Sequence, residues 1–264
     1  MELSLLSISE LQVSLRKREV TCLELAESCL RQVERRDGEL RAFITVLGEA
    51  LLAQARELDE RSPQERPPLA GIPLALKDLF ATRGIRTTAG SKFFTGHVPD
   101  EDALIVQRLM EAGALFVGKN NLHEVALGVT NINPHYGTSR NPWNSSHMTG
   151  GSSGGSAVAV ATGMCVAALG TDTGGSIRIP SALCGTVGLK PTYGRVSLRG
   201  VFPLSWNLDH AGPIARTVRD AAIVYAAIAG HDPFDPASAE VPCEDPLPGL
   251  DGGVAGWRIA LAAG

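Results

Sequence analysis

The segment from Met148 to Thr171 constrains the fold most, because it contains no Asp, Glu, Lys or Arg. Its length would suit a membrane span, but it is rich in Gly, Ser and Thr and lacks the Leu, Ile and Phe density of a span. It opens as TGGSSGGS over residues 149–156, with two adjacent serines between two Gly-Gly pairs, and then continues in small apolar residues. A flexible linker would not lead into an apolar run, and a packed strand would not carry so many glycines. We therefore predict a buried core segment of a soluble protein, with an unusual backbone and a hydroxyl at the same place.

The bulk composition is that of a soluble globular protein. The 264 residues are enough for one large domain or two small ones, and 44% hydrophobic and 20% charged residues are ordinary proportions. The net charge of −4 gives no basic surface for nucleic acid. The charged runs at 16–19 and 31–37 are predicted to be solvated helix faces.

Cysteine and histidine usage argues against disulfides and metals. The cysteines are odd in number and show no CxxC pairing, so neither a disulfide framework nor a zinc site is expected. The histidines show no metal-ligand spacing, and no metal is predicted. The N-terminus has no basic region of a signal peptide, so a reducing, cytoplasmic location is expected. The cysteines are Cys22, Cys29, Cys165, Cys184 and Cys243.

Capping and periodicity signals predict alternating helices and strands. Capping boxes at Ser7–Glu10 and Thr21–Glu24 begin two helices. The apolar runs and turn signals that follow indicate strands at 42–47, 72–78, 114–119 and 165–173, and helices at 49–61, 102–113 and 121–127. Residues 232–253 are predicted to be a loop, and 257–264 the start of a further strand. This alternation indicates an α/β fold with a largely buried sheet covered by helices on both faces.

Three features could carry chemistry. Gly174-Gly175 precedes Ser176 at the end of a predicted strand, where backbone N–H groups can form a nest for an anion or a developing oxyanion. Ser152 lies in the first Gly-rich loop, and a predicted strand between the two loops could bring them together. Lys77 interrupts an apolar run, and burial would lower its pKa toward neutrality and make it a base.

Other interpretations of these features are weaker. No Gly-Lys-Ser/Thr follows GGSSGG, so the phosphate-loop pattern fails. Gly151-x-Ser153-x-Gly155 matches a nucleophile elbow, but a loop precedes it instead of a strand. The partners for such a triad would be Asp209 and His210, whose adjacency is poor geometry. Taken alone, Lys77 could be a surface lysine at a strand end.

Residues 149–197, TGGSSGGSAVAVATGMCVAALGTDTGGSIRIPSALCGTVGLKPTYGRVS, closely resemble the amidase signature family. The resemblance extends through GIPLALKDLF (71–80), VGKNNLHEVALG (117–128), RNPWN (140–144) and SWNLDHAGPIART (205–217), and covers about residues 5–231. It implies a mixed sheet in the amidase signature fold and a hydrolase of non-peptide carbon–nitrogen bonds that acts on a small-molecule amide without metal or organic cofactor.

The resemblance also implies roles for individual residues. Ser176 matches the nucleophile, Ser152 the bridging serine after a cis peptide bond, and Lys77 the base. The implied oxyanion hole consists of the N–H groups of Thr173, Gly174, Gly175 and Ser176. Gly151 is expected to relieve crowding at the cis bond and Ser153 to support the site by hydrogen bonding. Asp172 and Arg178 are expected to brace the loop as a buried ion pair, with substrate binding as the alternative for Arg178.

Two kinds of family member are relevant. GVTNINPHYG (128–137) and GVFPLSWNLDH (200–210) look more like stand-alone amidases than like the glutaminase subunit of a tRNA-dependent amidotransferase, so we favour the hydrolase. Only the amidotransferase subunit would bring nucleic acid into contact with the assembly. No membrane partner is expected, and a homodimer is a further alternative.

Three regions are predicted along the chain: a helical region at 1–62 packing on the core, a catalytic core at 63–231, and a Pro- and acid-rich loop at 232–264 that begins a C-terminal portion. Family chains are usually much longer, which indicates that the C-terminal part is lacking here. A truncated, non-catalytic interaction module is therefore the alternative from another class.

Overall fold

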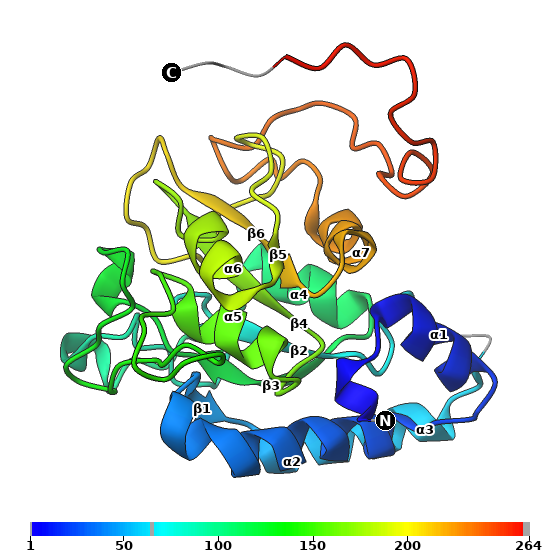
Figure 1. The fold of residues 1–264 in the computed structure, drawn as a ribbon, viewed down its shortest axis with the longest axis horizontal. Coiled ribbons are helices and arrows are strands. Elements are labelled where there is room, and N and C mark those ends of the chain that lie inside the picture. Colours follow the sequence, from blue (N-terminus) through cyan, green and yellow to red (C-terminus); the bar gives the residue numbers. More distant parts are fainter. Residues whose placement is uncertain (1, 64–65, 261–264) are drawn as a thin grey trace.

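The computed structural model describes residues 2–63 and 66–260. Helices and strands alternate, as the sequence indicates, and Figure 1 shows helices α5 (Gly154–Ala161) and α6 (Arg178–Cys184) in front of a central sheet and α4 (Leu104–Glu111) behind it. The remaining helices are α1 (Ile8–Arg16), α2 (Cys22–Leu40), α3 (Gly48–Glu60) and α7 (Val218–Ile228), and the short 3-10 turns are Leu3–Leu5, Lys92–Phe94 and Glu124–Ala126.

The sheet is mixed and has six strands in the order β1-β3-β2-β4-β6-β5. Its centre is parallel, because β2 pairs in parallel with both β3 and β4, whereas β1, β6 and β5 join in antiparallel fashion. The parallel strands therefore end at one edge, the position where open α/β sheets carry their sites. The strands are β1 (Phe43–Val46), β2 (Pro73–Lys77), β3 (Leu115–Asn120), β4 (Ala167–Asp172), β5 (Val187–Gly188) and β6 (His210–Ala215).

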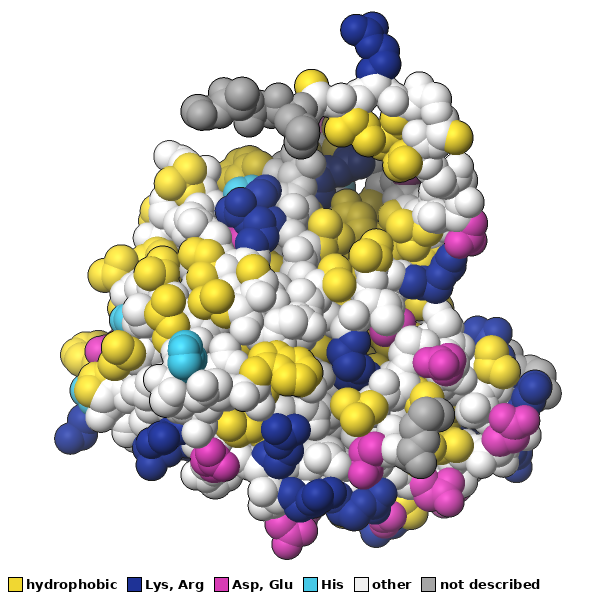
Figure 2. Space-filling view, viewed as in Figure 1, with side chains coloured by type: hydrophobic (Ala, Val, Ile, Leu, Met, Phe, Trp, Pro, Cys, Tyr) yellow, Lys and Arg dark blue, Asp and Glu magenta, His cyan; other side chains and the backbone are white. Residues whose placement is uncertain are grey.

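Local signals explain where the first helices begin. The Ser7 and Thr21 hydroxyls each accept the N–H of the residue three positions on, and the glutamate there accepts the N–H of the cap, so both capping boxes are confirmed. The charged run at 16–19 is exposed, but α1 ends at Arg16, so the predicted helix face is wrong for residues 17–19. The run at 31–37 lies within α2, with Arg31, Glu34 and Arg35 exposed and Gln32 buried. Figure 2 shows Lys, Arg, Asp and Glu side chains gathered along the lower edge, over the N-terminal helices.

The uncharged segment forms the centre of the core. Helix α5 and strand β4 are almost wholly buried, and α5 packs against β2, β3, β4 and β6. This confirms the prediction of a buried core segment. The same hydrophobic core includes Ile8, Leu11 and Leu25 from the N-terminal helices.

Two predicted elements are wrong. The sequence predicts a helix over 121–127, but only the 3-10 turn Glu124–Ala126 forms, because Val125 and Ala126 take left-handed backbone angles (φ 46° and 60°). It also predicts a strand from 257, but residues 257–260 are exposed and form no strand. Residues 261–264 of that prediction lie outside the described residues.

Two glycine substitutions test the packing of the helices. A Cβ on Gly155, in α5, would overlap the Asn121 carbonyl oxygen and lie 2.5 Å from that of Ala42, so Gly155→Ala is expected to lower the free energy of unfolding by about 1–3 kcal/mol or more. A Cβ on Gly38, inside α2, would meet nothing within 4 Å, so Gly38→Ala is expected to raise it by about 0.5–1 kcal/mol. Urea unfolding of both variants measures these changes in the free energy of unfolding. A change of the same sign and size in both variants would contradict the prediction.

Candidate active site

Lys77 ends β2 with its side chain fully buried. Its Nζ lies 2.6 Å from Ser152 Oγ and 2.8 Å from Thr171 Oγ1. Burial lowers the pKa of Lys77 to about 7, although the negative charges of Asp209 and Asp172 oppose the shift. The lysine is therefore substantially neutral near pH 7, as its apolar sequence context predicted.

A second buried lysine shows what distinguishes Lys77. Lys119 on β3 pairs in register with Leu76, one residue before Lys77, so its side chain points to the other face of the sheet. Its Nζ donates to Phe80 O (2.7 Å) and lies 3.5 Å from the carboxylate of Asp78. Lys77 makes no ion pair with any described residue, so its amine is surrounded by hydroxyls instead of a carboxylate.

The first Gly-rich loop presents Ser152 to this lysine. The Gly151–Ser152 peptide bond is cis, as the resemblance implied, and Ser152 is fully buried just before α5. The segment that follows β3 packs on the loop, because the His123 N–H donates to Ser152 O (3.2 Å) and the Gly154 N–H donates to Asn131 Oδ1 (3.0 Å). A Cβ on Gly151 would lie 2.7 Å from the Asn131 nitrogen, so close approach requires glycine there.

The two Gly-rich loops meet, as their spacing suggested. The Ser153 N–H donates to Ser176 O (3.2 Å), and the Ser153 hydroxyl donates to Thr171 O (3.2 Å). The Ser153 hydroxyl contacts backbone atoms and no histidine, which leaves the nucleophile-elbow interpretation without its base. Ser176 is only 6% exposed. Across the described residues, its hydroxyl has no hydrogen-bond partner, so Ser152 and Ser176 are not directly bonded in this structure.

The turn after β4 leaves several backbone N–H groups without an acceptor among the described residues. The N–H groups of Thr173, Gly174 and Ser176 have no acceptor in the described part of the chain. A Cβ on Gly174 would meet nothing within 4 Å, so there is open space beside Gly174. The Gly175 N–H was also expected to be an oxyanion donor, but it donates to Asp172 Oδ1 at 2.8 Å. Three of the four expected donors thus have no hydrogen-bond acceptor among the described residues.

The buried Asp172 side chain stabilises this turn through hydrogen bonds to its backbone. Its carboxylate, fully buried, accepts the N–H groups of Gly175, Ile177 and Arg178 as well as the Arg178 guanidinium at 2.9 Å and 3.0 Å. Burial alone would raise the pKa of Asp172, but these hydrogen bonds together lower it. The predicted ion pair exists, but it is not fully buried: the Arg178 side chain is 54% exposed.

Sequence reasoning missed two contacts at the site. Thr171 contacts Lys77 from inside β4, and nothing in its sequence context marked it. The Asp209 carboxylate accepts the Thr173 hydroxyl (2.5 Å) and the N–H groups of Leu204 and Ser205 (2.8 and 3.0 Å). The sequence suggested Asp209 only as a triad partner, whereas it ties the serine-bearing turn to the loop before β6.

The remaining sequence expectations concern metals, cysteines and membranes. No group of three or more His, Cys, Asp or Glu residues within residues 2–63 and 66–260 is arranged to hold a metal ion. The five cysteines are all free, and four of them are buried. None of the helices in the described ranges has both the length and the hydropathy to cross a bilayer.

Comparisons with known proteins identify the family of the chain. A family model described as Amidase matches residues 24–261. The A subunit of the glutamyl-tRNA(Gln) amidotransferase of Maridesulfovibrio salexigens is 48% identical over 93% of the chain and 50% of its own length. The native peptide amidase of Stenotrophomonas maltophilia superposes with a TM-score of 0.85 and 43% identity, over 90% of this chain and 50% of that one.

A further solved structure gives a TM-score of 0.92 with 40% identity, over 95% of this chain and 56% of the other. It is the inhibitor-bound form of a vestigial protein complex described as revealing the evolutionary origins of an s-triazine catabolic enzyme. The chain spans about half the length of the curated relatives that it matches.

Proposed function

The chain belongs to the amidase family, and from that premise we propose that it hydrolyses the carbon–nitrogen bond of a carboxylic amide. The observation that carries the proposal is the buried contact of 2.6 Å between Lys77 Nζ and Ser152 Oγ, made by a lysine whose pKa is lowered to about 7. A neutral lysine can accept a proton from a neighbouring hydroxyl, which an ordinary exposed lysine does poorly at pH 7.

The proposed nucleophile is Ser176, with Ser152 as the bridging group and Lys77 as the base. Lys77 accepts the Ser152 proton while Ser152 accepts the Ser176 proton, and Ser176 Oγ bonds to the amide carbonyl carbon. The carbonyl oxygen becomes negatively charged beside the free N–H groups of Thr173, Gly174 and Ser176. One such donor is worth about 3–4 kcal/mol of transition-state stabilisation.

The second half of the reaction returns the protons. The amine leaves with the proton that Lys77 had taken through Ser152, and the acyl group remains as an ester on Ser176. Water then attacks this ester, and the carboxylic acid leaves as Ser176 regains its proton. Ser152 must approach Ser176 when substrate binds, and catalytic hydrogen bonds commonly tighten at that stage.

A second candidate function uses the same chemistry. The relative at 48% identity belongs to an amidotransferase, and in such an assembly the amide would be glutamine and the leaving amine would be ammonia for a partner. Measuring ammonia release from glutamine and from a simple aliphatic amide separates the two candidates. Release from the aliphatic amide, lost in Ser176→Ala, is the result expected for the hydrolase, whereas release from glutamine alone would favour the amidotransferase role.

Lys77 should leave a signature in the pH dependence of activity. Only neutral Lys77 can act as the base, and its pKa is about 7, so kcat/KM is expected to rise with pH through a midpoint near 7 and then level off. The acid limb is measured between about pH 5 and 9, a range that brackets this pKa, with a neutral amide substrate. A profile that stays flat across pH 7 would contradict the assignment of the base.

The same group should affect stability in the opposite sense to a lysine held in an ion pair. Folding lowers the pKa of Lys77 from 10.5 to about 7, so the unfolded chain binds one more proton between these values. The free energy of unfolding, measured relative to Lys77→Met, is therefore expected to rise from about pH 7 to about pH 10.5 and to be constant below pH 7. A difference that does not change with pH would show that Lys77 is not held neutral.

A further inference from the structure

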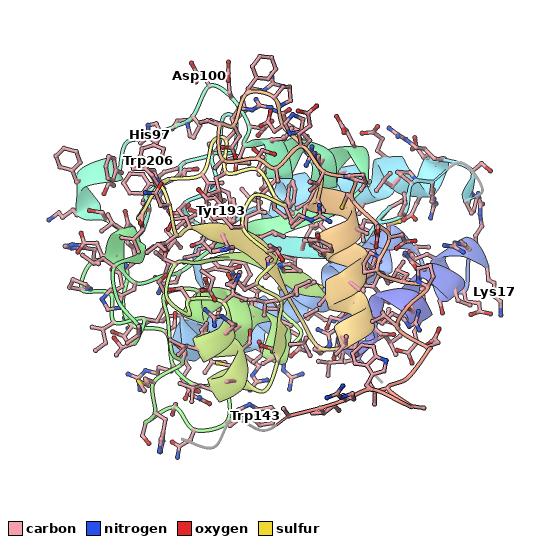
Figure 3. The ribbon with its side chains drawn as sticks, turned by 90° about the horizontal axis from the view of Figure 1, so that it is seen from above. Lys17, His97, Asp100, Trp143, Tyr193 and Trp206 are labelled. Carbon is pink, nitrogen blue, oxygen red and sulfur yellow. The ribbon has the colours of Figure 1, made fainter. Side chains whose placement is uncertain are left out.

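A cavity of about 450 Å³ lies between the connection from β5 to β6 and the segment after α7. Tyr193 and Trp206, both labelled in Figure 3, belong to this connection and line the cavity. Phe234 lines it from the other segment. The remaining lining residues used below are Leu198, Arg199, Asp209, Asp235 and Ala237.

The charged groups Arg199 and Asp235 of the lining are already paired. Arg199 Nε donates to Asp232 Oδ2 (2.8 Å), and its guanidinium lies over the Phe234 ring, 5.7 Å from the centroid. Asp235 accepts the N–H groups of Leu198 (2.7 Å) and Ala237 (2.9 Å). What the cavity offers a ligand is therefore mostly aromatic and aliphatic surface, because Arg199, Asp235 and Asp209 all have hydrogen-bond partners already.

The cavity adjoins the proposed catalytic turn. Asp209, which lines the cavity, accepts a hydrogen bond from the Thr173 hydroxyl at 2.5 Å. Thr173 is one of the proposed oxyanion donors. The Tyr193 ring packs edge-on against His210 at 5.6 Å, and His210 pairs in register with Asp172 at the end of β4. These two contacts connect the cavity lining to Asp172 and Thr173, where β4 ends and the turn that contains Ser176 begins.

We propose that this cavity binds an apolar, aromatic-sized group of the amide substrate while the carbonyl lies at Ser176. The inference rests on the proposed function and specifies its substrate class. A cavity of about 150 Å³ holds benzene, so about 450 Å³ accommodates a phenyl ring with its linking atoms. Small aliphatic amides would leave the cavity unfilled and gain nothing from its aromatic wall.

The test measures binding of phenylacetamide and acetamide to the chain by ligand-observed NMR, so that turnover is not needed. Trp206→Ala, which removes part of the wall, and Ala237→Phe, which fills space, are each expected to raise the Kd for phenylacetamide about tenfold, the size of a lost aromatic contact. Acetamide binding should not change. Trp257 is 70% exposed against 77% for Trp206 and lies outside the cavity lining, so Trp257→Ala is the matched control.

An unchanged Kd for phenylacetamide in both cavity variants would overturn the subsite, even if Ser176 proves reactive and the proposed function stands. A tenfold loss in both, with the Trp257→Ala control unchanged, would support it. If the loss occurs in a chain whose Ser176 hydrolyses no amide, the proposed function fails and the cavity is an apolar binding site without a reaction, which overturns its assignment as a substrate subsite.

Discussion

Replacing Lys77 with methionine is expected to lower kcat/KM for amide hydrolysis by roughly 10⁴-fold or more, the scale of losing a base that acts together with its nucleophile. The physical reason is that Lys77 is the only described lysine in contact with Ser152, at 2.6 Å. Methionine fills a similar volume but cannot accept a proton. Steady-state kinetics with a simple amide measures the effect, and activity within about tenfold of wild type would contradict the role of Lys77.

Stability separates this effect from misfolding. Lys77 makes no ion pair within the described ranges, so Lys77→Met should leave the free energy of unfolding unchanged or higher. Lys119→Met should instead lower it by about 3 kcal/mol or more, because the buried Asp78 carboxylate loses its cation. Lys92 is exposed, and Lys92→Met serves as the matched control that should change neither activity nor stability.

Asp172→Asn is expected to have the largest combined effect on stability and activity. The buried carboxylate accepts three backbone N–H groups and the Arg178 guanidinium, and an amide would turn an N–H₂ group toward these donors. We expect a loss of about 2–4 kcal/mol in the free energy of unfolding. We also expect kcat to fall by roughly 10²-fold or more, because the turn that holds the proposed oxyanion donors loses its anchor.

The control for Asp172→Asn is another carboxylate paired with arginine. Asp251, 78% exposed, pairs with Arg219, so Asp251→Asn should change stability by less than about 1 kcal/mol. Arg178→Met should lower the free energy of unfolding by less than Asp172→Asn does, because the half-exposed guanidinium is only one of the partners of Asp172. Chemical denaturation and kinetics of the three variants give the comparison. An equal decrease in the free energy of unfolding for Asp172→Asn and Asp251→Asn would refute the anchoring role.

The structural features that depend on residues close in sequence were the most predictable. The capping boxes at Ser7 and Thr21 and the central strands lie where the local pattern placed them, because cap hydrogen bonds and short apolar runs are local features of the sequence. The buried neutral lysine was also predictable, since Lys77 interrupts a run of apolar residues. The predicted helix at 121–127 fails because the backbone there is held by distant loops: the His123 N–H bonds to Ser152 O and the Val125 N–H to Ala89 O.

Long-range partners could not be predicted in the same way. Asp209 reaches Thr173 across 36 positions of sequence, and only the pairing of β4 with β6 brings the two together. The Gly175 N–H donates to the Asp172 carboxylate. The sequence of the turn does not specify this bond, because it depends on the orientation of the Asp172 side chain. The partners of each functional group depend on sheet register, whereas the candidate groups themselves were recognisable from their residue types, their spacing and the resemblance to the amidase signature family.

The most direct test of the central claim is labelling of the chain with a fluorophosphonate, with the adduct located by mass spectrometry. Wild type, Lys77→Met and Ser176→Ala are compared at about pH 8, where Lys77 with a pKa of about 7 is mostly neutral. The account predicts an adduct on Ser176 that is absent from Ser176→Ala and greatly slowed in Lys77→Met. An adduct on Ser153, or labelling of Ser176 that is indifferent to Lys77, would contradict it.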